Sequence, residues 1–277
     1  MRLLRRGKVK DIYELDEKTL LFKFSDRVSA FDVILPTPIP RKGEVLCRFA
    51  KFFFENLGVA HHMVEMNPPN SLLVKKLKIV PIEFVVRGYL YGSLYERVIR
   101  GEVKNLGIES ILAARLPKPL LDPTTKSDLM DVPITREEIL SSSIIDEERL
   151  RYMESTSIAI YEKISRLADK AGFILADLKL EYGIDESGEV LLADSIGPDE
   201  FRLWPAETYS PGKPQESYDK QIVRDWLIKT GYKSRLDEAR SKGLPPPPPP
   251  ELPREIVEFT SMRYIEAYER LTGEVFG

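Results

Sequence analysis

The sequence predicts an α+β protein that folds as one large domain or as two lobes. Three observations lead to this prediction. Strand-like alternation dominates the front of the chain, strand-like and helical patterns mix in the remainder, and 43% of the 277 residues are hydrophobic. A chain of this length and composition can bury a sizeable core without disulfides.

The front of the chain favours a β-hairpin followed by a helix. In residues 7–35, the run GKVKDIYEL alternates, DEK makes a turn, and TLLFKFSD returns as an apolar strand, which together predict a hairpin. The run GEVLCRFAKFFFENLG then has apolar residues at helical spacing. It ends at Gly58, a typical C-terminal stop.

The next segment predicts two strands and a boundary between lobes. After an NPPN turn, SLLVKKLKIVPIEFVVRGYL forms two β-rich runs that are separated at Pro81. Because prolines interrupt regular elements, we interpret this point as a hinge. We therefore expect an N-terminal β-rich lobe over residues 1–80 and a mixed α/β lobe over residues 81–277, which includes the C-terminal helices.

The middle of the chain predicts a long loop, two helices and a second hairpin. Residues 112–135 carry four prolines and little periodicity, so we expect a loop of the kind that is often functional. Two helices follow from Thr135, the second over about residues 146–170 with Gly172 past its end. The stretch GFILADLKLEYGIDESGEVLLADSIGPD then alternates on both sides of a turn at residues 185–188, which predicts a hairpin.

The C-terminal region predicts two more helices with a stiff proline segment between them. The runs YDKQIVRDWLIKTG and ELPREIVEFTSMRYIEAYERLTG have helical patterns, and six consecutive prolines begin at Pro245. Such a run adopts an extended polyproline conformation. We favour a rigid connector between packed helices over a ligand for SH3-type domains.

Composition excludes several classes of function. The formal net charge is −3 with 31% charged residues, so no global basic field attracts nucleic acid. The basic N-terminal residues precede no apolar segment, and no window approaches the roughly 18 apolar residues of a membrane span. The single Cys47 fits a buried position in a reducing compartment better than a nucleophilic role. We therefore expect a cytoplasmic protein that binds neither membranes nor nucleic acid.

The second hairpin brings acidic and basic side chains to one face. Asp177, Lys179 and Glu181 alternate along one strand and therefore share a face. A symmetric turn centred on residues 186–187 puts Lys179 opposite Asp194, with Glu181 as its diagonal neighbour. Carboxylates placed in this way can hold Mg²⁺, and the lysine can offset charge on a transferring phosphoryl group. A solvated strand face with a cross-strand salt bridge is the alternative interpretation.

The first hairpin offers a candidate site for a polyphosphate. Lys8 and Lys10 follow Gly7, and a glycine-opened turn can present ammonium groups to phosphate oxygens. A solvated strand face explains the same pattern without any ligand.

Two further groups of residues could hold a phosphate or a carboxylate. Arg87 and Ser93 lie at and after the end of the strand IEFVVRGYL, where neighbouring glycines allow a ligand to approach the backbone. Asp199 and Arg202 lie in the turn SIGPDEFRLW, in which Trp204 is interpreted as a core residue. Both arginines also fit structural ion pairs.

Taken in order, the motifs resemble one family of enzymes over nearly the whole chain. The segments that carry the resemblance are RGKVKDIYE, SDRVSAFD, IPRKGEVLCRFAKFFFE, LVKKLKIVPIEFVVRGYLYGSL, LLDPTTKSD, GFILADLKLEYGID, LLADSIGPDEFRLW and YDKQIVRDWL. The most diagnostic stretch is VPIEFVVRGYLYGSL, followed by LADLKLEYG and the PDEFRLW turn. In these motifs the chain is similar to the SAICAR synthase family.

The resemblance implies a two-lobed ATP-grasp or kinase-like fold with the nucleotide between the lobes. The roles that it implies are catalytic for Lys179 and Asp177, ATP-binding for Lys8, Lys10, Lys76, Val80 and Glu83, metal-binding for Glu181 and Asp194, and ribotide-binding for Asp32, Arg87, Ser93, Arg202 and Lys220. Two positions depart from the pattern of the family. Ser195 follows the metal aspartate where an acidic residue is common, and Met130 precedes Asp131 where a histidine is common.

The activity implied by the resemblance is an ATP- and Mg²⁺-dependent ligation in purine biosynthesis. The γ-phosphoryl group would pass to the carboxylate of carboxyaminoimidazole ribotide, and L-aspartate would displace phosphate from the acyl phosphate to give SAICAR. A homodimer is one assembly that the sequence permits. Two alternatives stay open: a kinase-like or ATP-grasp enzyme with another acceptor, and a non-enzymatic RNA- or protein-binding module that uses Lys75, Lys76, Lys78 and the proline run.

Overall fold

The computed structural model describes residues 1–126 and 132–277, and the chain divides into two compact units. Unit 1 comprises Met1–Phe52, Met63–Lys76 and Tyr218–Gly277, and unit 2 comprises Phe53–His62 and Leu77–Ser217. Each unit combines a β-sheet with helices, so the predicted α+β class is confirmed.

The units differ from the expected lobes at residues 53–62, which belong to unit 2, and at the C-terminal end of the chain. The expected boundary after residue 80 lies near Lys76, where one segment of unit 1 ends. The residues from Tyr218 onward, which were expected in the second lobe, belong to unit 1. The reason is shared burial, because Val223 packs in one apolar cluster with Val28.

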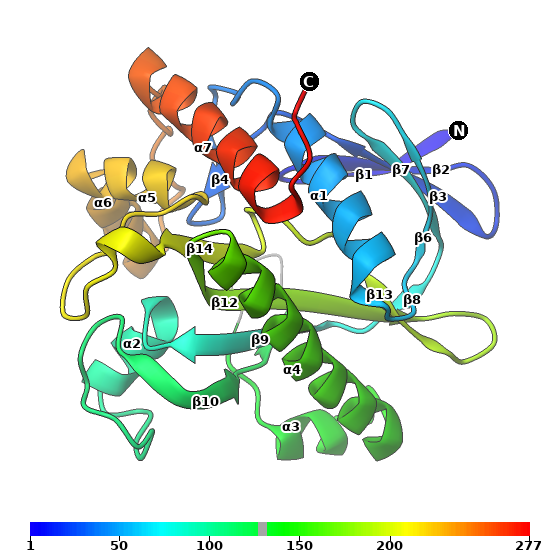
Figure 1. Ribbon diagram of the computed structural model, residues 1–277, viewed down its shortest axis with the longest axis horizontal. Helices are drawn as coiled ribbons and strands as arrows, with labels where there is room; N and C mark the ends of the chain where they lie inside the picture. The colour runs from blue at the N-terminus through cyan, green and yellow to red at the C-terminus, as the bar shows by residue number, and fades with distance from the viewer. Residues whose placement is uncertain (127–131) are drawn as a thin grey trace. The chain divides into compact units, whose positions relative to one another are not determined.

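Unit 1 contains an antiparallel sheet in the order β1–β2–β3–β7–β6 (Figure 1). The strands are β1 (Arg2–Arg6), β2 (Lys10–Glu14), β3 (Thr19–Phe24), β6 (Met63–Asn67) and β7 (Ser71–Lys75), and β4 (Ser29–Ala30) pairs with β5 (Val33–Ile34) in a separate ribbon. The hairpin predicted in residues 7–35 is confirmed as β2 and β3. Strand β1 was not predicted, because it lies exposed at an edge of the sheet and has no buried face.

The helices of unit 1 pack through apolar side chains, and the C-terminal ones join the cluster that contains Val28. They are α1 (Lys42–Leu57), whose last residues belong to unit 2, α5 (Gln221–Lys229), α6 (Tyr232–Ser241) and α7 (Arg254–Thr272). The predicted helices α1, α5 and α7 are confirmed, whereas the mostly polar α6 was not predicted. The rings of Phe49 in α1 and Tyr268 in α7 lie 5.2 Å apart.

The proline run joins α6 to α7 along the surface of this cluster. The hydroxyl of Tyr232 donates to the carbonyl oxygen of Pro247 over 3.0 Å. The backbone N–H of Leu252 donates to Thr37 Oγ1 over 2.9 Å, and Leu252 itself is buried. The segment is therefore a packed connector, as expected.

Unit 2 is built on a second sheet with the central order β10–β9–β12–β13. Its strands are β8 (Lys78–Ile79), β9 (Ile82–Tyr89), β10 (Arg115–Leu121), β11 (Thr124–Thr125), β12 (Phe173–Ile184), β13 (Val190–Ala193) and β14 (Phe201–Pro205). Its helices are α2 (Gly92–Ile99), α3 (Arg136–Ser141), α4 (Glu147–Lys170) and the short 3-10 helix Ala206–Thr208. The two helices predicted after Thr135 are confirmed as α3 and α4, and α4 packs across β12 and β9 (Figure 1).

The loop predicted over residues 112–135 is wrong in its first half. Strand β10 runs through it and pairs antiparallel with β9, from Arg115↔Tyr89 to Leu121↔Val86. The register shifts between Arg115 and Leu120, and this irregular stretch contains both prolines of the strand. A proline lacks the N–H that a central strand needs, so prolines occur at sheet edges and bulges. Strand β10 occupies such an edge.

The second predicted hairpin is confirmed, but its register is shifted by one residue. Glu181 pairs with Ala193, and Ile184 pairs with Val190, so the turn is centred on Ser187. The prediction that Lys179 lies opposite Asp194 is therefore wrong. The Oδ1 atom of Asp185 accepts hydrogen bonds from the backbone N–H groups of Ser187 and Glu189 over 2.9 and 3.0 Å, which fixes a five-residue turn where a symmetric shorter one was assumed.

Gly88 in β9 is required by packing against α4. A Cβ atom at this position would lie 1.8 Å from Tyr161 Oη. That hydroxyl donates to the carbonyl oxygen of Leu175 over 2.7 Å, and burial raises the pKa of Tyr161, so the group stays a neutral donor. The close approach expected at Gly88 therefore joins α4 to the sheet.

We expect Gly88→Ala to destabilise the protein by about 2 kcal/mol or more, since overpacking a tight contact typically costs about 1–3 kcal/mol. Tyr161→Phe should also destabilise, because the Leu175 carbonyl loses its donor. The double variant Gly88→Ala/Tyr161→Phe should lose clearly less than the sum of the two, because the phenol oxygen causes most of the clash. Urea unfolding of the four proteins measures this coupling, and strict additivity would contradict the packing argument.

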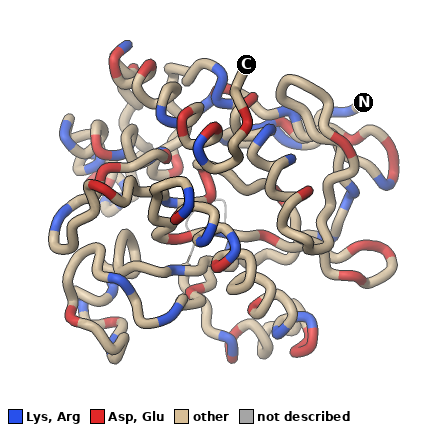
Figure 2. Tube along the Cα trace, viewed as in Figure 1, with Lys and Arg blue, Asp and Glu red and all other residues tan. Residues whose placement is uncertain are grey.

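The composition predicted mixed charge, no membrane-spanning segment and a buried cysteine. Lys and Arg are interspersed with Asp and Glu over the trace (Figure 2). In residues 1–126 and 132–277, no helix is long and apolar enough to cross a membrane. Cys47 is fully buried, as expected, and burial raises the pKa of its thiol to about 12.

Candidate functional site

Two lysine–glutamate pairs lie on the sheet of unit 2. The Nζ atom of Lys179 in β12 lies 2.6 Å from Glu83 Oε2 in β9. Glu181, two residues along β12, forms an ion pair with Lys126, which follows β11. Both carboxylates are mostly buried, with side chains 15% and 13% exposed. The structure therefore brings three predicted residues, Lys179, Glu181 and Glu83, into one charged group and adds Lys126.

Asp194 adjoins this group from the end of β13. It follows Ala193, the residue that pairs with Glu181, so the two predicted metal carboxylates lie on neighbouring strands. Asp194 has a φ of 60°, in the left-handed region that aspartate tolerates better than most residues. His62 Nε2 donates to the carbonyl oxygen of Asp194 over 3.1 Å, and His62 is buried. The imidazole thus supports the unusual backbone at Asp194.

The predicted ribotide residues of unit 2 form a cluster around Asp177, in which the two arginines are largely buried and Ser93 is exposed. Arg87 Nη2 donates to Ser93 Oγ over 3.0 Å, and its Nη1 lies 3.7 Å from Asp177 Oδ2. Arg202 forms an ion pair with the same carboxylate oxygen, and its guanidinium lies over the ring of Tyr91 at 5.1 Å. The structure therefore brings together Arg87, Ser93 and Arg202. Asp177 holds the two arginines.

Sequence reasoning missed two members of this cluster, Asp122 and Arg97. Arg87 Nε and Arg97 Nη2 donate to Asp122 over 2.5 and 2.6 Å. The three arginine side chains are only 7 to 13% exposed. With three guanidinium groups and two carboxylates, the cluster has a net positive charge, which suits a dianionic phosphate or a carboxylate. Asp122 lies in the segment LLDPTTKSD, so its acidic type within a family motif was the available signal.

The predicted phosphate residues of unit 1 surround a tight turn. Gly7 N–H donates to the Lys10 carbonyl over 2.8 Å, and a Cβ atom at Gly7 would lie 2.7 Å from that oxygen. Lys8 in the turn pairs with Asp32 at 2.6 Å, and both side chains are about half exposed, at 43% and 48%. Lys10 is buried, with its Nζ 4.9 Å from the centre of the Phe22 ring. The two lysines therefore have different surroundings, although both adjoin one turn.

Three further predicted residues occupy separate positions. Lys76 Nζ lies 2.8 Å from Glu14 Oε1 in unit 1. Val80 is buried in unit 2, and its N–H donates to the Tyr182 carbonyl over 2.9 Å. Lys220 is the residue before α5 in unit 1 and is partly buried.

The carboxylates of Glu181 and Asp194 fit Mg²⁺ by their chemistry. In residues 1–126 and 132–277, no group of three or more His, Cys, Asp or Glu side chains is arranged to hold a metal ion. One or two carboxylates are sufficient where substrate phosphates and water complete the shell of Mg²⁺. The pair therefore suits a metal that binds together with a nucleotide. Of the two departures noted in the sequence, Ser195 is buried beside Asp194, and Met130 with Asp131 lies outside the described residues.

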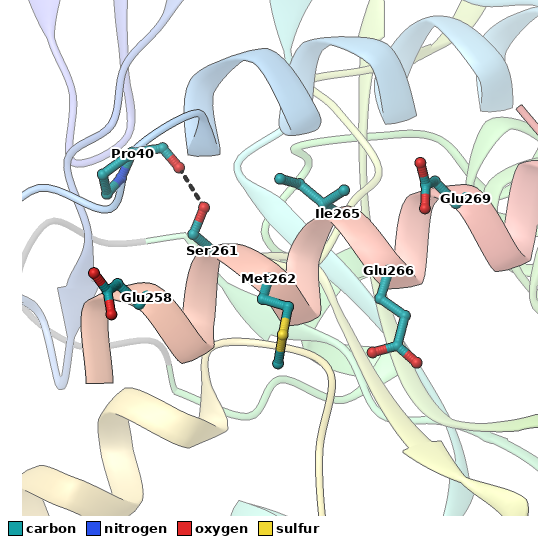
Figure 3. Close-up of a pocket in the computed structure, with 7 residues that line it drawn as sticks. All are labelled: Pro40, Glu258, Ser261, Met262, Ile265, Glu266 and Glu269. Atoms are coloured by element: carbon teal, nitrogen blue, oxygen red, sulfur yellow. Dashed lines mark hydrogen bonds between the residues drawn. The ribbon is translucent and has the colours of Figure 1, made fainter. Parts of the chain in front are cut away.

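A hollow of about 490 Å³ in unit 1 lies along α7 and does not suit an anionic ligand (Figure 3). Its lining residues are Pro40, Glu258, Ser261, Met262, Ile265, Glu266 and Glu269. Ser261 closes one end by donating to the carbonyl oxygen of Pro40 over 2.7 Å. The three glutamates disfavour a phosphate, and none of these seven residues is a predicted site residue. We therefore assign the chemistry to the charged clusters.

A family comparison decides between the candidate classes. The model of the family described as SAICAR synthetase matches residues 3–239. The chain belongs to the SAICAR synthetase family. The resemblance seen in the motifs is thereby confirmed, and with it the class of enzyme. A phosphoribosylaminoimidazole-succinocarboxamide synthase of Nitrosopumilus maritimus is 52% identical over 275 residues, which cover 99% of each chain.

Solved structures of the SAICAR synthetase family have the same fold. A SAICAR synthase from Saccharomyces cerevisiae, complexed with SAICAR, is 33% identical with a TM-score of 0.84, over 100% of this chain and 96% of that one. A SAICAR synthetase in complex with ADP is 28% identical with a TM-score of 0.75, over 99% of each chain. The predicted fold class is therefore supported along the whole chain.

Proposed function

We propose that this chain joins L-aspartate to the carboxylate of carboxyaminoimidazole ribotide and converts ATP to ADP and phosphate in purine biosynthesis. The observation that carries the proposal is the 52% identity to a synthase of that name over 99% of both chains. The structural neighbours complexed with SAICAR and with ADP give the proposal its substrate classes. The charged clusters of unit 2 supply the chemistry that such a reaction needs.

The reaction must first activate a carboxylate. A carboxylate resists attack by an amine because its leaving group would be oxide. Transfer of the γ-phosphoryl group of ATP to the ribotide carboxylate gives an acyl phosphate, and the amine of aspartate then displaces phosphate. Lysines that neutralise the transferring group lower the barrier of the first step.

The lysine–glutamate group of unit 2 is our candidate for this first step. Lys179 is held by Glu83 at 2.6 Å and keeps 43% of its side chain exposed, so its ammonium group is positioned and accessible. Lys8 and Lys10 of unit 1 are proposed to contact the polyphosphate, and the segment from Lys76 to Glu83 to contact the adenine. Glu181 and Asp194 would hold Mg²⁺. When bound, this metal would offset negative charge on the phosphate oxygens.

The arginine cluster of unit 2 is our candidate for the ribotide. Arg87, Ser93 and Arg202 present donors from three different elements in one cluster, in which the arginines are largely buried and Ser93 is exposed. Asp177 is proposed to orient the arginines, and it stands in contact with both of them. Asp32 and Lys220 of unit 1 are proposed as further ribotide contacts. The cluster would exclude water from the ribotide phosphate and hold its carboxylate in place.

Location and assembly complete the proposal. The proposed role in purine biosynthesis and the single, buried Cys47 are both consistent with a location in the cytoplasm. A homodimer stays a prediction, which sedimentation analysis of the purified protein would test by mass.

Omission of single substrates tests the proposed function. We expect ADP release in a coupled assay to require ribotide, aspartate and Mg²⁺ together, with one SAICAR formed per ADP. ADP release that persists without the ribotide would favour a kinase-like enzyme with another acceptor. Absence of Mg²⁺-dependent nucleotide binding would contradict an enzyme of this class and favour the binding module.

A further inference from the structure

Two carboxylates are neighbours in the sheet of unit 2. The register of β12 on β9 ends with Leu180 paired to Phe84, and Glu181 and Glu83 are the next residues along the two strands. Like charges in neighbouring cross-strand positions repel each other. Each glutamate has its own lysine partner, which offsets this repulsion.

The lysine that pairs with Glu181 does not come from a strand next to β12. Lys126 follows β11, and β11 pairs with β9 on the side away from β12. Its backbone N–H donates to the Pro81 carbonyl over 3.1 Å, so the main chain is anchored beside β9. The side chain of Lys126 must therefore cross β9 to contact Glu181, and each strand spacing is about 4.8 Å.

Stability alone gives a weak reason for this contact. The side chain of Lys126 is 35% exposed, and solvent at the lysine screens its ion pair with Glu181, which reduces the contribution to stability. Ordering a long lysine also costs conformational entropy. The contact nevertheless places a cation on the carboxylate that the proposed function assigns to Mg²⁺.

We propose that Lys126 is an exchangeable counter-ion of the metal site. Its ammonium group neutralises Glu181 before metal binds, leaves that carboxylate when a divalent cation takes its place, and then contacts phosphate oxygens of the nucleotide. The ammonium keeps its proton throughout, and no covalent bond changes. The divalent cation thus replaces the singly charged ammonium at Glu181, and the ammonium stays near the phosphates. The inference rests on the proposed assignment of Glu181 to the metal.

The exchange predicts effects of opposite sign for Lys126→Met. In the nucleotide-free protein, removal of the competing ammonium should tighten binding of Mn²⁺, used as the probe, by at least about threefold. With MgATP, ribotide and aspartate, kcat should fall by at least about tenfold, because a donor to the transferring phosphate is lost. A purely structural ion pair would leave Mn²⁺ affinity unchanged or weaken it.

Electron paramagnetic resonance of free Mn²⁺ and steady-state kinetics measure these two effects. Lys118→Met, a change of the same kind at an exposed residue of β10, is the matched control and should alter neither. Unchanged or weaker Mn²⁺ binding by Lys126→Met would overturn the exchange, and so would an unchanged kcat. Glu181→Gln distinguishes a failure of the metal assignment from a failure of the exchange. Wild-type Mn²⁺ affinity in that variant would overturn the metal assignment itself, whereas its loss together with a failed Lys126 result would overturn only the exchange.

Discussion

Replacement of Asp194 with asparagine is expected to lower kcat by several orders of magnitude and to leave the fold intact. The variant removes one of the two carboxylates proposed to hold Mg²⁺ but keeps the size of the side chain. Asparagine also tolerates the left-handed backbone that Asp194 adopts, with its φ of 60°. Alanine would be a less informative choice, since it would add backbone strain to the loss of charge.

A change of the same kind in the same hairpin is the control for Asp194→Asn. Glu186 is exposed in the turn between β12 and β13, so Glu186→Gln removes a carboxylate without touching the proposed metal site. We expect this control to retain wild-type turnover. Thermal unfolding should place both variants within a few degrees of the wild type. Near-normal turnover of Asp194→Asn at saturating Mg²⁺ would sink the metal assignment.

The elements that the sequence predicted well are those whose burial follows one simple period. The hairpin of β2 and β3 alternates, and α1 and α4 carry apolar residues at helical spacing, with Gly58 and Gly172 in the left-handed conformation after them. In these segments the local pattern and the tertiary packing agree. Strand β10 was missed because its two prolines predict a loop. They fit a strand only at a bulged sheet edge, which the sequence does not reveal.

The register of the second hairpin was beyond a count along the sequence. A turn of five residues in place of four shifts the strand pairing by one residue, so each side chain then lies opposite a different partner. The side chain of Asp185 decides this by bonding the backbone at Ser187 and Glu189. Glu181 and Asp194 still lie on neighbouring strands despite the shift, because Glu181 pairs with Ala193, the residue before Asp194.

The site residues also divide into those that the sequence predicted and those that it missed. Family motifs located Arg87, Ser93 and Arg202, and the structure brings them together in unit 2. Asp122 and Lys126 were missed because their partners come from other elements, Arg87 in β9 for Asp122 and Glu181 in β12 for Lys126, in contacts that no local pattern encodes. The sequence gives the residue types, and the sheet decides which of them meet.

Arg202→Ala is expected to raise KM for the ribotide by roughly 10- to 150-fold, which corresponds to about 1.5–3 kcal/mol for a charge-assisted contact. KM for ATP should stay within about twofold, because the arginine cluster is assigned to the ribotide alone. Asp177 would keep Arg87 as a partner at 3.7 Å, so its carboxylate would not be left buried without a cation. The fold should therefore survive the change.

Arg202→Lys and Arg100→Ala distinguish recognition from structural support. Lysine keeps the charge but lacks the planar fork of donors, so Arg202→Lys should raise KM for the ribotide by an intermediate factor. Arg100 forms an exposed ion pair with Glu102, with side chains 56% and 50% exposed, and its replacement by alanine should leave both KM values unchanged. Steady-state kinetics with each substrate varied gives the answer. Equal weakening of ATP and ribotide by Arg202→Ala, together with a lower unfolding midpoint, would mean that Arg202 supports the fold through Asp177 and Tyr91 and does not hold the ribotide.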